Sequence, residues 1–251
     1  MNAEPSTLIL PGESLAGGPA EDVVLGPLLL ARGLSGAREI VRIWRPEPTA
    51  AFSRRDSRRP GFERATEVVR ERGFVPVIRP QGGQLAAYHR GSVAIDHVVR
   101  TSNPTDGLKA RFEQFATLHA GVLSAFGLDV RVGELPGEYC PGEYSINVAG
   151  VTKVVGSAQR ITRDGWLFST IVQVAGSAEI RDVLTAAYDA LGYELDSSTI
   201  GSAEDYEPGI RAGAVEQALI DQYSAGSDVI RGELSTEILR EVSELSRPNP
   251  C

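Results

Sequence analysis

The spacing of hydrophobic residues predicts six helices in this chain. Apolar side chains that recur every three or four positions would line one face of a helix. This pattern covers residues 22–33, 60–72, 106–126, 180–191, 212–224 and 233–245. It is clearest in residues 106–126, where leucine, phenylalanine and valine side chains share one face.

Shorter apolar or alternating segments predict nine strands. They lie at residues 39–44, 49–53, 74–78, 85–88, 93–99, 129–132, 145–148, 153–160 and 166–174. We expect residues 74–78 to form a buried strand. Residues 85–88 and 93–99 are predicted to pair as a hairpin, and so are residues 145–148 and 153–160.

The order of these elements predicts the fold class. Strands come in groups, and helices separate the groups instead of following each strand, which favours an α+β protein over a Rossmann arrangement. We expect a mixed, largely antiparallel sheet flanked by helices, with room for a small second sheet. Residues 1–21, rich in Pro, Gly and Ser, are predicted to be an irregular lead-in, and residues 22–251 a single domain.

Composition narrows the function classes. The formal net charge is −8, so nothing favours binding to nucleic acid. No segment approaches the roughly 20 apolar residues that span a bilayer, and no signal peptide is visible. Two cysteines make no secreted disulfide framework, so we expect a cytoplasmic protein without a membrane partner. The three histidines lack the spacing of metal ligands, and we expect no metal site.

The first candidate for chemistry is a diglycine loop. Gly82 and Gly83 lie between two predicted strands, in the segment Arg79 to His89. Adjacent glycines let the backbone approach a ligand and direct N–H groups at an anion, and Arg79 could add a charged fork. An ordinary turn would use the same glycines, so this motif alone is weak.

The second candidate is Cys140, which stands between two copies of Pro-Gly-Glu-Tyr. Two tight turns would hold the thiol on a stiff loop, a good mount for a nucleophile. The nearby Glu138 and Glu143 disfavour a thiolate, so a reactive sulfur would need a cation close by. A buried, inert cysteine is the alternative.

The third candidate is Lys153, one of only two lysines among 25 basic residues. It opens a predicted strand that continues through Gly156, Ser157 and Ala158, and such small residues leave room for a ligand against the backbone. A lysine ammonium there could bind a phosphate or stabilise a developing oxyanion. A solvated lysine on an edge strand is the alternative.

These three segments, in this order, resemble the catalytic domain of lipoate–protein ligases and octanoyltransferases. That family carries an Arg-x-x-Gly-Gly-(Arg/Gly)-Ala-Val-x-His type of loop, here residues 79–89, and a Gly-x-Lys-(x)-x-Gly-Ser-Ala-Gln strand, here residues 150–159. Residues 42–46, 51–56 and 199–202 also resemble family segments, and the likeness spans roughly residues 22–225. Departures are Gln84, where the family often has Arg or Gly, and residues 166–170, which lack the family's histidine.

The resemblance implies a biotin/lipoate-ligase fold and an enzyme that moves a lipoyl or octanoyl group onto a lysine of a lipoyl-domain protein. Cys140 would carry the acyl group as a thioester, and Lys153 with strand N–H groups would steady the oxyanion. The donor would be an acyl-carrier protein or free lipoate. The implied acyl- or nucleotide-binding residues are Arg54, Arg79, Gly82, Gly83, Gln84, Ala86, Tyr88, His89, Gly156, Ser157, Ala158 and Gln159.

Two other functions remain open at this point. An ATP-dependent ligase would use an acyl-adenylate, with ATP and Mg²⁺ as cofactors and Cys140 as a bystander. The chain ends before the accessory domain that many such ligases append, which favours the thioester route. A binding module could also keep the fold without the chemistry. All of these hypotheses require the diglycine loop and Lys153 to face each other across one pocket.

Overall fold

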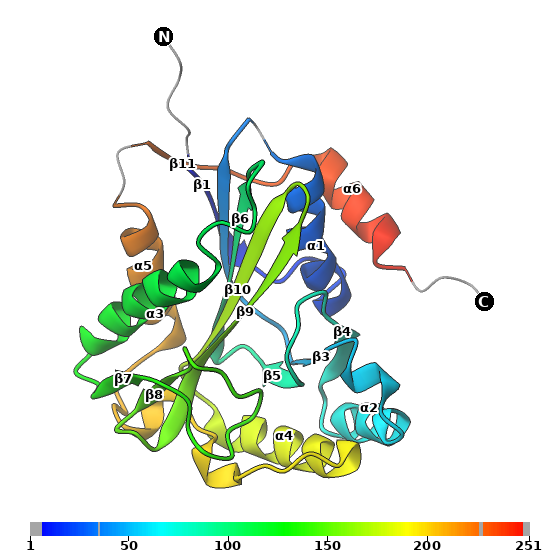
Figure 1. Cartoon of the computed structure of the whole chain (residues 1–251), viewed down its shortest axis with the longest axis vertical. Helices are drawn as coiled ribbons and strands as arrows, with labels where there is room; N and C mark the ends of the chain where they lie inside the picture. The colour runs from blue at the N-terminus through cyan, green and yellow to red at the C-terminus, as the bar shows by residue number, and fades with distance from the viewer. Residues whose placement is uncertain (1–6, 35, 226–227, 248–251) are drawn as a thin grey trace.

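The computed structural model describes residues 7–34, 36–225 and 228–247, and a large sheet forms its centre (Figure 1). Eight strands form this sheet in the order β11-β1-β2-β6-β10-β9-β8-β7. Their bounds are β1 Thr7–Glu13, β2 Glu39–Arg45, β6 Ser92–Arg100, β7 Val130–Val132, β8 Ile146–Val148, β9 Thr152–Thr162, β10 Gly165–Gln173 and β11 Val229–Arg231. β1 runs parallel to both neighbours, and the remaining pairs are antiparallel. The predicted mixed, largely antiparallel sheet is confirmed.

A second sheet of three strands lies beside the first. Its order is β4-β3-β5, with bounds Val75–Ile78, Thr49–Phe52 and Ala86–Tyr88. Helices α2 (Phe62–Glu71) and α4 (Ser177–Leu191) pack on it through an apolar cluster that includes Phe52, Val69 and Leu184. This small sheet matters for function because its β4–β5 connection carries the diglycine loop.

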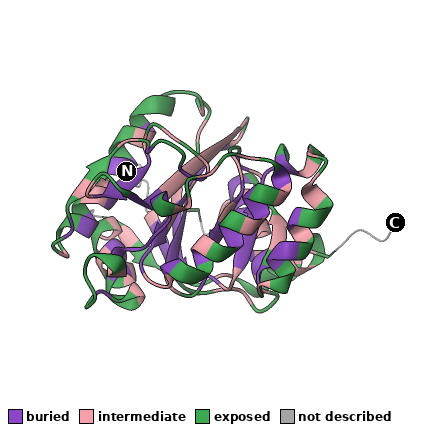
Figure 2. Ribbon diagram, turned by 90° about the horizontal axis from the view of Figure 1, so that it is seen from below, coloured by how far each residue is buried: buried purple, intermediate pink, exposed green. Residues whose placement is uncertain are grey.

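Helices cover both faces of the large sheet. Alternate side chains of β1 point to opposite sides: Leu8 and Leu10 pack toward α1 (Pro19–Arg32) and α6 (Thr236–Leu245), whereas Ile9 packs with the cluster of α3 (Leu108–Ser124) and α5 (Ala212–Tyr223). Figure 1 shows the two helix pairs on either side of the strands. Buried residues concentrate between these layers (Figure 2). Three short 3-10 helices complete the elements, at Asp56–Arg58, Ser197–Thr199 and Ala203–Asp205.

The start of the chain corrects one prediction. Residues 7–13 are not irregular but form β1, and α1 begins at Pro19. Pairing with β2 satisfies the backbone of this segment, and Leu8, Ile9 and Leu10 enter the core. Proline and glycine around these three residues concealed a strand that depends on distant partners. β11 was missed for the same reason, since it is three residues long and pairs only with β1.

Two strand predictions near the site also need correction. β4 is not buried: it is an edge strand of the small sheet, and Val75 and Ile78 are 44% and 49% exposed. β5 and β6 do not form a hairpin, because β5 pairs with β3 in the small sheet and β6 pairs with β2 and β10 in the large one. The chain therefore crosses from one sheet to the other at His89–Gly91. The hairpin of β8 and β9 is confirmed.

Candidate active site

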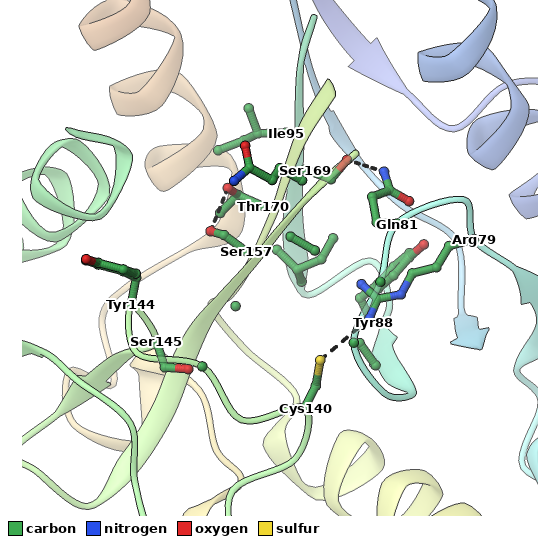
Figure 3. A pocket seen from close by; sticks show the side chains of 18 of the residues that line it. Arg79, Gln81, Tyr88, Ile95, Cys140, Tyr144, Ser145, Ser157, Ser169 and Thr170 are labelled. Atoms are coloured by element: carbon green, nitrogen blue, oxygen red, sulfur yellow. Dashed lines mark hydrogen bonds between the residues drawn. The ribbon is translucent and has the colours of Figure 1, made fainter. Parts of the chain in front are cut away.

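A pocket of about 630 Å³ lies on the face of the large sheet that also carries α1. Its floor is made by small side chains of β9 and β10, among them Gly156, Ala158 and Ser169. The β4–β5 loop forms one wall, and the loop before β8 forms another (Figure 3). Pockets of this size commonly hold small-molecule ligands. The site thus lies between the two sheets.

The structure brings the three candidate segments together around this pocket. From the diglycine segment, Arg79, Gly82, Gly83, Ala86 and Tyr88 line it; from the loop, Cys140; and from the strand, Lys153, Gly156, Ser157, Ala158 and Gln159. The diglycine loop and Lys153 therefore share one cavity, as the acyl-transfer hypothesis requires. Burial raises the pKa of Tyr88, so this hydroxyl stays protonated.

Lys153 is fully buried and is bound to the loop that carries Cys140. Its Nζ donates to Glu138 Oε1 at 2.9 Å and to the backbone carbonyls of Tyr139 and Cys140 at 2.9 and 2.8 Å. An ammonium group has three N–H donors, and these contacts use all of them. Lys153 therefore fixes the conformation of the loop and neutralises Glu138, the carboxylate two residues before the cysteine.

The Cys140 sulfur faces the diglycine loop. Its Sγ accepts from the backbone N–H of Gln84 at 3.3 Å and from Arg79 Nη2 at 3.5 Å (Figure 3). A guanidinium and a backbone N–H thus direct positive charge and a hydrogen-bond donor at the sulfur. The second nearby carboxylate, Glu143, pairs with Lys109 on the exposed rim at 3.2 Å. The cation that the sequence required near the sulfur is Arg79.

The main chain at Cys140 is held in an unusual conformation. Its φ is 42°, in the left-handed region that non-glycine residues seldom adopt. The amide of Cys140 donates to the Tyr188 hydroxyl at 2.7 Å, and that hydroxyl lies 2.9 Å from the Leu85 carbonyl. Burial raises the pKa of Tyr188 well above its ordinary value. This buried hydroxyl links the cysteine loop to the segment after the diglycine.

Gly83 cannot be replaced without disturbing the sulfur. Its φ is +97°, and a Cβ built there would lie 2.7 Å from Cys140 Sγ and 2.9 Å from Arg79 Nη2. Gly82 differs, since a Cβ there would meet nothing within 4 Å. The close approach explains why the second glycine of the pair is needed: it lets the loop backbone reach the sulfur.

The remaining predicted residues lie elsewhere or act through the backbone. Arg54 is exposed and does not line the pocket. His89 is buried against Gly176, with Nε2 3.2 Å from its carbonyl, and its Nδ1 accepts from Gly91. The backbone N–H of Gln84 donates to Cys140 Sγ, and its backbone carbonyl accepts from Arg79. An Arg or Gly at this position would offer the same two backbone groups.

Sequence reasoning missed a polar group at the other end of the pocket. Asp22, Gln81, Asp96 and Ser169 all line it. Gln81 Nε2 donates to Ser169 Oγ at 2.6 Å, and Ser169 Oγ donates to Asp96. Burial raises the pKa of Asp96 to about 6. An available signal was the carboxylate within the apolar run of β6, together with Ser169, which lies in the segment that lacks the family's histidine.

Among residues 7–34, 36–225 and 228–247, His, Cys, Asp and Glu side chains form no group of three or more that could hold a metal ion. Within the same described ranges, every helix is too short or too polar to cross a membrane.

The fold and the pocket place this chain in the class of lipoate–protein ligase folds. A lipoate–protein ligase A bound with ATP aligns with a TM-score of 0.70 at 17% identity, covering 97% of this chain and 94% of that one. A bi-partite lipoate protein ligase structure from Thermoplasma acidophilum aligns with a TM-score of 0.72 at 14% identity, covering 97% and 92%. These likenesses establish the shared fold.

The chain belongs to the lipoyl protein ligase A/B catalytic domain family, whose model matches residues 28–205. A curated relative in Geobacillus kaustophilus, an octanoyl-GcvH:protein N-octanoyltransferase, is 29% identical over 165 residues, or 66% of this chain and 58% of the relative. One of the same name in Bacillus velezensis is 24% identical over 82% of this chain and 69% of its own length. The match thus spans little more than half of the Geobacillus protein. The family resemblance seen in the sequence is confirmed.

Proposed function

We propose that this protein transfers an octanoyl or lipoyl-type acyl group to a lysine of a lipoyl-domain protein through a thioester on Cys140. The observation that carries the proposal is the position of the sulfur, which lines an acyl-sized pocket and accepts from Arg79 and the Gln84 amide. The names of the relatives favour octanoyl as the acyl group and octanoylated GcvH, itself a lipoyl-domain protein, as the donor. We also retain the prediction that the protein acts in the cytoplasm.

The first half-reaction moves the acyl group to the protein. The Cys140 thiolate attacks the thioester or amide carbonyl of the donor, and the carbonyl electrons move onto oxygen. The Gln84 backbone N–H and the Arg79 guanidinium, both directed at the sulfur, are the groups that would donate to that oxyanion as it forms beside the sulfur. When the oxyanion collapses, the bond to the donor's leaving group breaks, and the leaving group takes up a proton.

The second half-reaction releases the acyl group to the acceptor. A neutral lysine amine attacks the Cys140 thioester, the carbon–sulfur bond breaks, and the amine loses a proton as the amide forms. In this scheme Lys153 is a positioning residue and not an oxyanion donor, because its three N–H groups are already used by Glu138 and two carbonyls. That assignment replaces the role inferred for Lys153 from the sequence.

The test is acyl transfer to the protein itself. The chain is incubated with octanoyl-GcvH or octanoyl-acyl-carrier protein, and intact mass spectrometry follows an octanoyl adduct. We expect the adduct in the parent chain and in Cys251→Ser, the matched control at the other cysteine, and its loss in Cys140→Ser. An adduct that persists in Cys140→Ser, or none with either donor, would overturn the thioester route.

The same preparation distinguishes the ATP-dependent alternative. A ligase would give lipoate-dependent exchange of pyrophosphate with ATP in the presence of Mg²⁺, and this exchange would survive Cys140→Ser. We expect no exchange. A chain with neither activity would be a binding module.

A further inference from the structure

The floor of the pocket is a groove that runs along the strands of the large sheet. Cross-strand pairing places Gly156 beside Ile171 in one row, and Ala158, Ser169 and Asp96 in the next. Because alternate residues of a strand face the same side, Gln173, Ile171 and Ser169 follow one another along this floor. The four residue steps from Gln173 to Ser169 span about 13 Å at ~3.3 Å per residue.

Cys140 lies at the Gln173 end of this groove. Tyr139, its neighbour in sequence, lines the pocket together with Gln173, and the two side chains lie close enough to interact. Lys153 donates to the Cys140 carbonyl. The same side chain lies beside Gly156, since a Cβ on that glycine would be 3.3 Å from Lys153 Cε. An acyl chain on the sulfur would therefore extend along the floor toward Ser169.

Helix α1 closes the groove beyond Ser169. The next residue on the same face of β10 is Leu167, which is buried in the cluster packed under α1. Gly26 of α1 is so close that a Cβ there would lie 2.9 Å from Asp96 Oδ2 and 3.1 Å from a Leu167 methyl group. Asp22, one turn earlier on the helix, also lines the pocket. The groove thus ends in a wall of packed helix.

The surface of this wall is polar and internally hydrogen-bonded. Gln81 donates to Ser169, Ser169 donates to Asp96, and Asp22 pairs with Arg42 at 2.5 Å. An apolar chain end pushed past Ser169 would separate groups that are buried and satisfied by each other, which is costly. The wall also holds the diglycine loop, because Gln81 belongs to that loop.

We propose that the Gln81–Ser169–Asp96 wall sets the length of the acyl chain, admitting about eight carbons and rejecting much longer chains. This inference rests on the proposed acyl-transfer function and adds the substrate limit. An extended chain of eight carbons is roughly as long as three residues of backbone, about 10 Å. Such a chain on Cys140 ends about 3 Å before the Ser169 position on the ~13 Å floor, which brings its terminal carbon into contact with the wall.

The experiment measures chain-length profiles with and without the wall. The parent chain, Asp96→Ala and Asp96→Asn are incubated with hexanoyl, octanoyl, decanoyl and dodecanoyl carrier-protein thioesters, and adducts are quantified by intact mass. The parent is expected to fall off beyond octanoyl. Asp96→Ala, which removes three heavy atoms from the wall, should raise the decanoyl-to-octanoyl ratio roughly tenfold, the value of burying two more methylenes. Asp96→Asn keeps the size and should keep the limit.

A second measurement separates this inference from the proposed chemistry. Binding of the free hexanoate, octanoate, decanoate and dodecanoate to Cys140→Ser, with and without Asp96→Ala, is followed by titration calorimetry. The same cut-off in binding without any adduct would support the wall and overturn the thioester route. Adducts or binding with equal preference for octanoyl and dodecanoyl in the parent, an unchanged profile in Asp96→Ala, or no binding of any acid would overturn the wall.

Discussion

The two ends of the pocket each contain a buried ion pair, and the pairs differ in how completely they are satisfied. At the cysteine end, Lys153 and Glu138 are 1% and 0% exposed, and Glu138 also accepts from the amides of Leu135 and Gly142. At the α1 end, Arg42 forms an ion pair with Asp22, and Asp96 lies nearby. Arg42 Nη1 has no hydrogen-bond partner among the described residues. A balanced pair fixes a loop in one conformation. Burial raises the pKa of Asp96, the nearby Asp22 carboxylate adds to the rise, and Ser169 and Arg42 offset it only in part.

The largest expected effect comes from breaking the balanced pair. In Lys153→Met, Glu138 stays buried with its charge unmatched, and we expect the free energy of unfolding to fall by about 3–5 kcal/mol. Urea unfolding measures this loss. The double variant Lys153→Met with Glu138→Gln is the matched control, since it removes both charges and should recover a large part of the stability. A single variant as stable as the parent would show that the pair does not hold the loop.

The next effect concerns the sulfur and not the fold as a whole. Gly83→Ala places a methyl group against Cys140 Sγ and Arg79, so the loop must retreat from the sulfur. A displacement of about 1 Å can cost roughly 100-fold in rate, and we expect a loss of that order in octanoyl adduct formation. Gly82→Ala, whose added carbon meets nothing within 4 Å, is the control and should lose far less. Equal losses in the two variants would contradict the contact as the cause.

The same contrast shows what the sequence could reveal. The diglycine, Cys140 and Lys153 are chemically conspicuous residues on short segments, and their meeting could be inferred from the family pattern. The Gln81–Ser169–Asp96 wall, with Asp22 of α1 beside it, is made of residues that have ordinary places in their own segments. They meet only through strand register and packing: Gln81 lies in the diglycine loop, Asp96 on β6 and Ser169 on β10. For the same reason, β1 and the separation of β5 from β6 escaped prediction, because strand partners distant in sequence determine both.

The contacts of Lys153 could not be predicted from the sequence either. A lysine at the start of a strand can face solvent, a ligand or a buried carboxylate, and the choice depends on where the preceding loop folds. Here the loop folds so that Glu138 and two backbone carbonyls all accept hydrogen bonds from the Lys153 ammonium group. Arg54 shows the converse: the family pattern placed it among the binding residues, yet the turn after β3 leaves it in solvent.

The smallest expected effect tests the unbalanced end through pH. Asp96 has a folded pKa of about 6 against an ordinary value of 3.8, because burial penalises its charged form more than Arg42 and Ser169 stabilise it. The folded state therefore binds more protons than the unfolded state between these two values, and this group's contribution to stability falls as pH rises from about 4 to about 6. Asp96→Asn removes the titration. Relative to the parent, we expect the variant to gain on the order of 2 kcal/mol between pH 4 and pH 7 in urea unfolding. A difference between variant and parent that does not change with pH would mean that Asp96 keeps its charge, and that Arg42 balances both carboxylates after all.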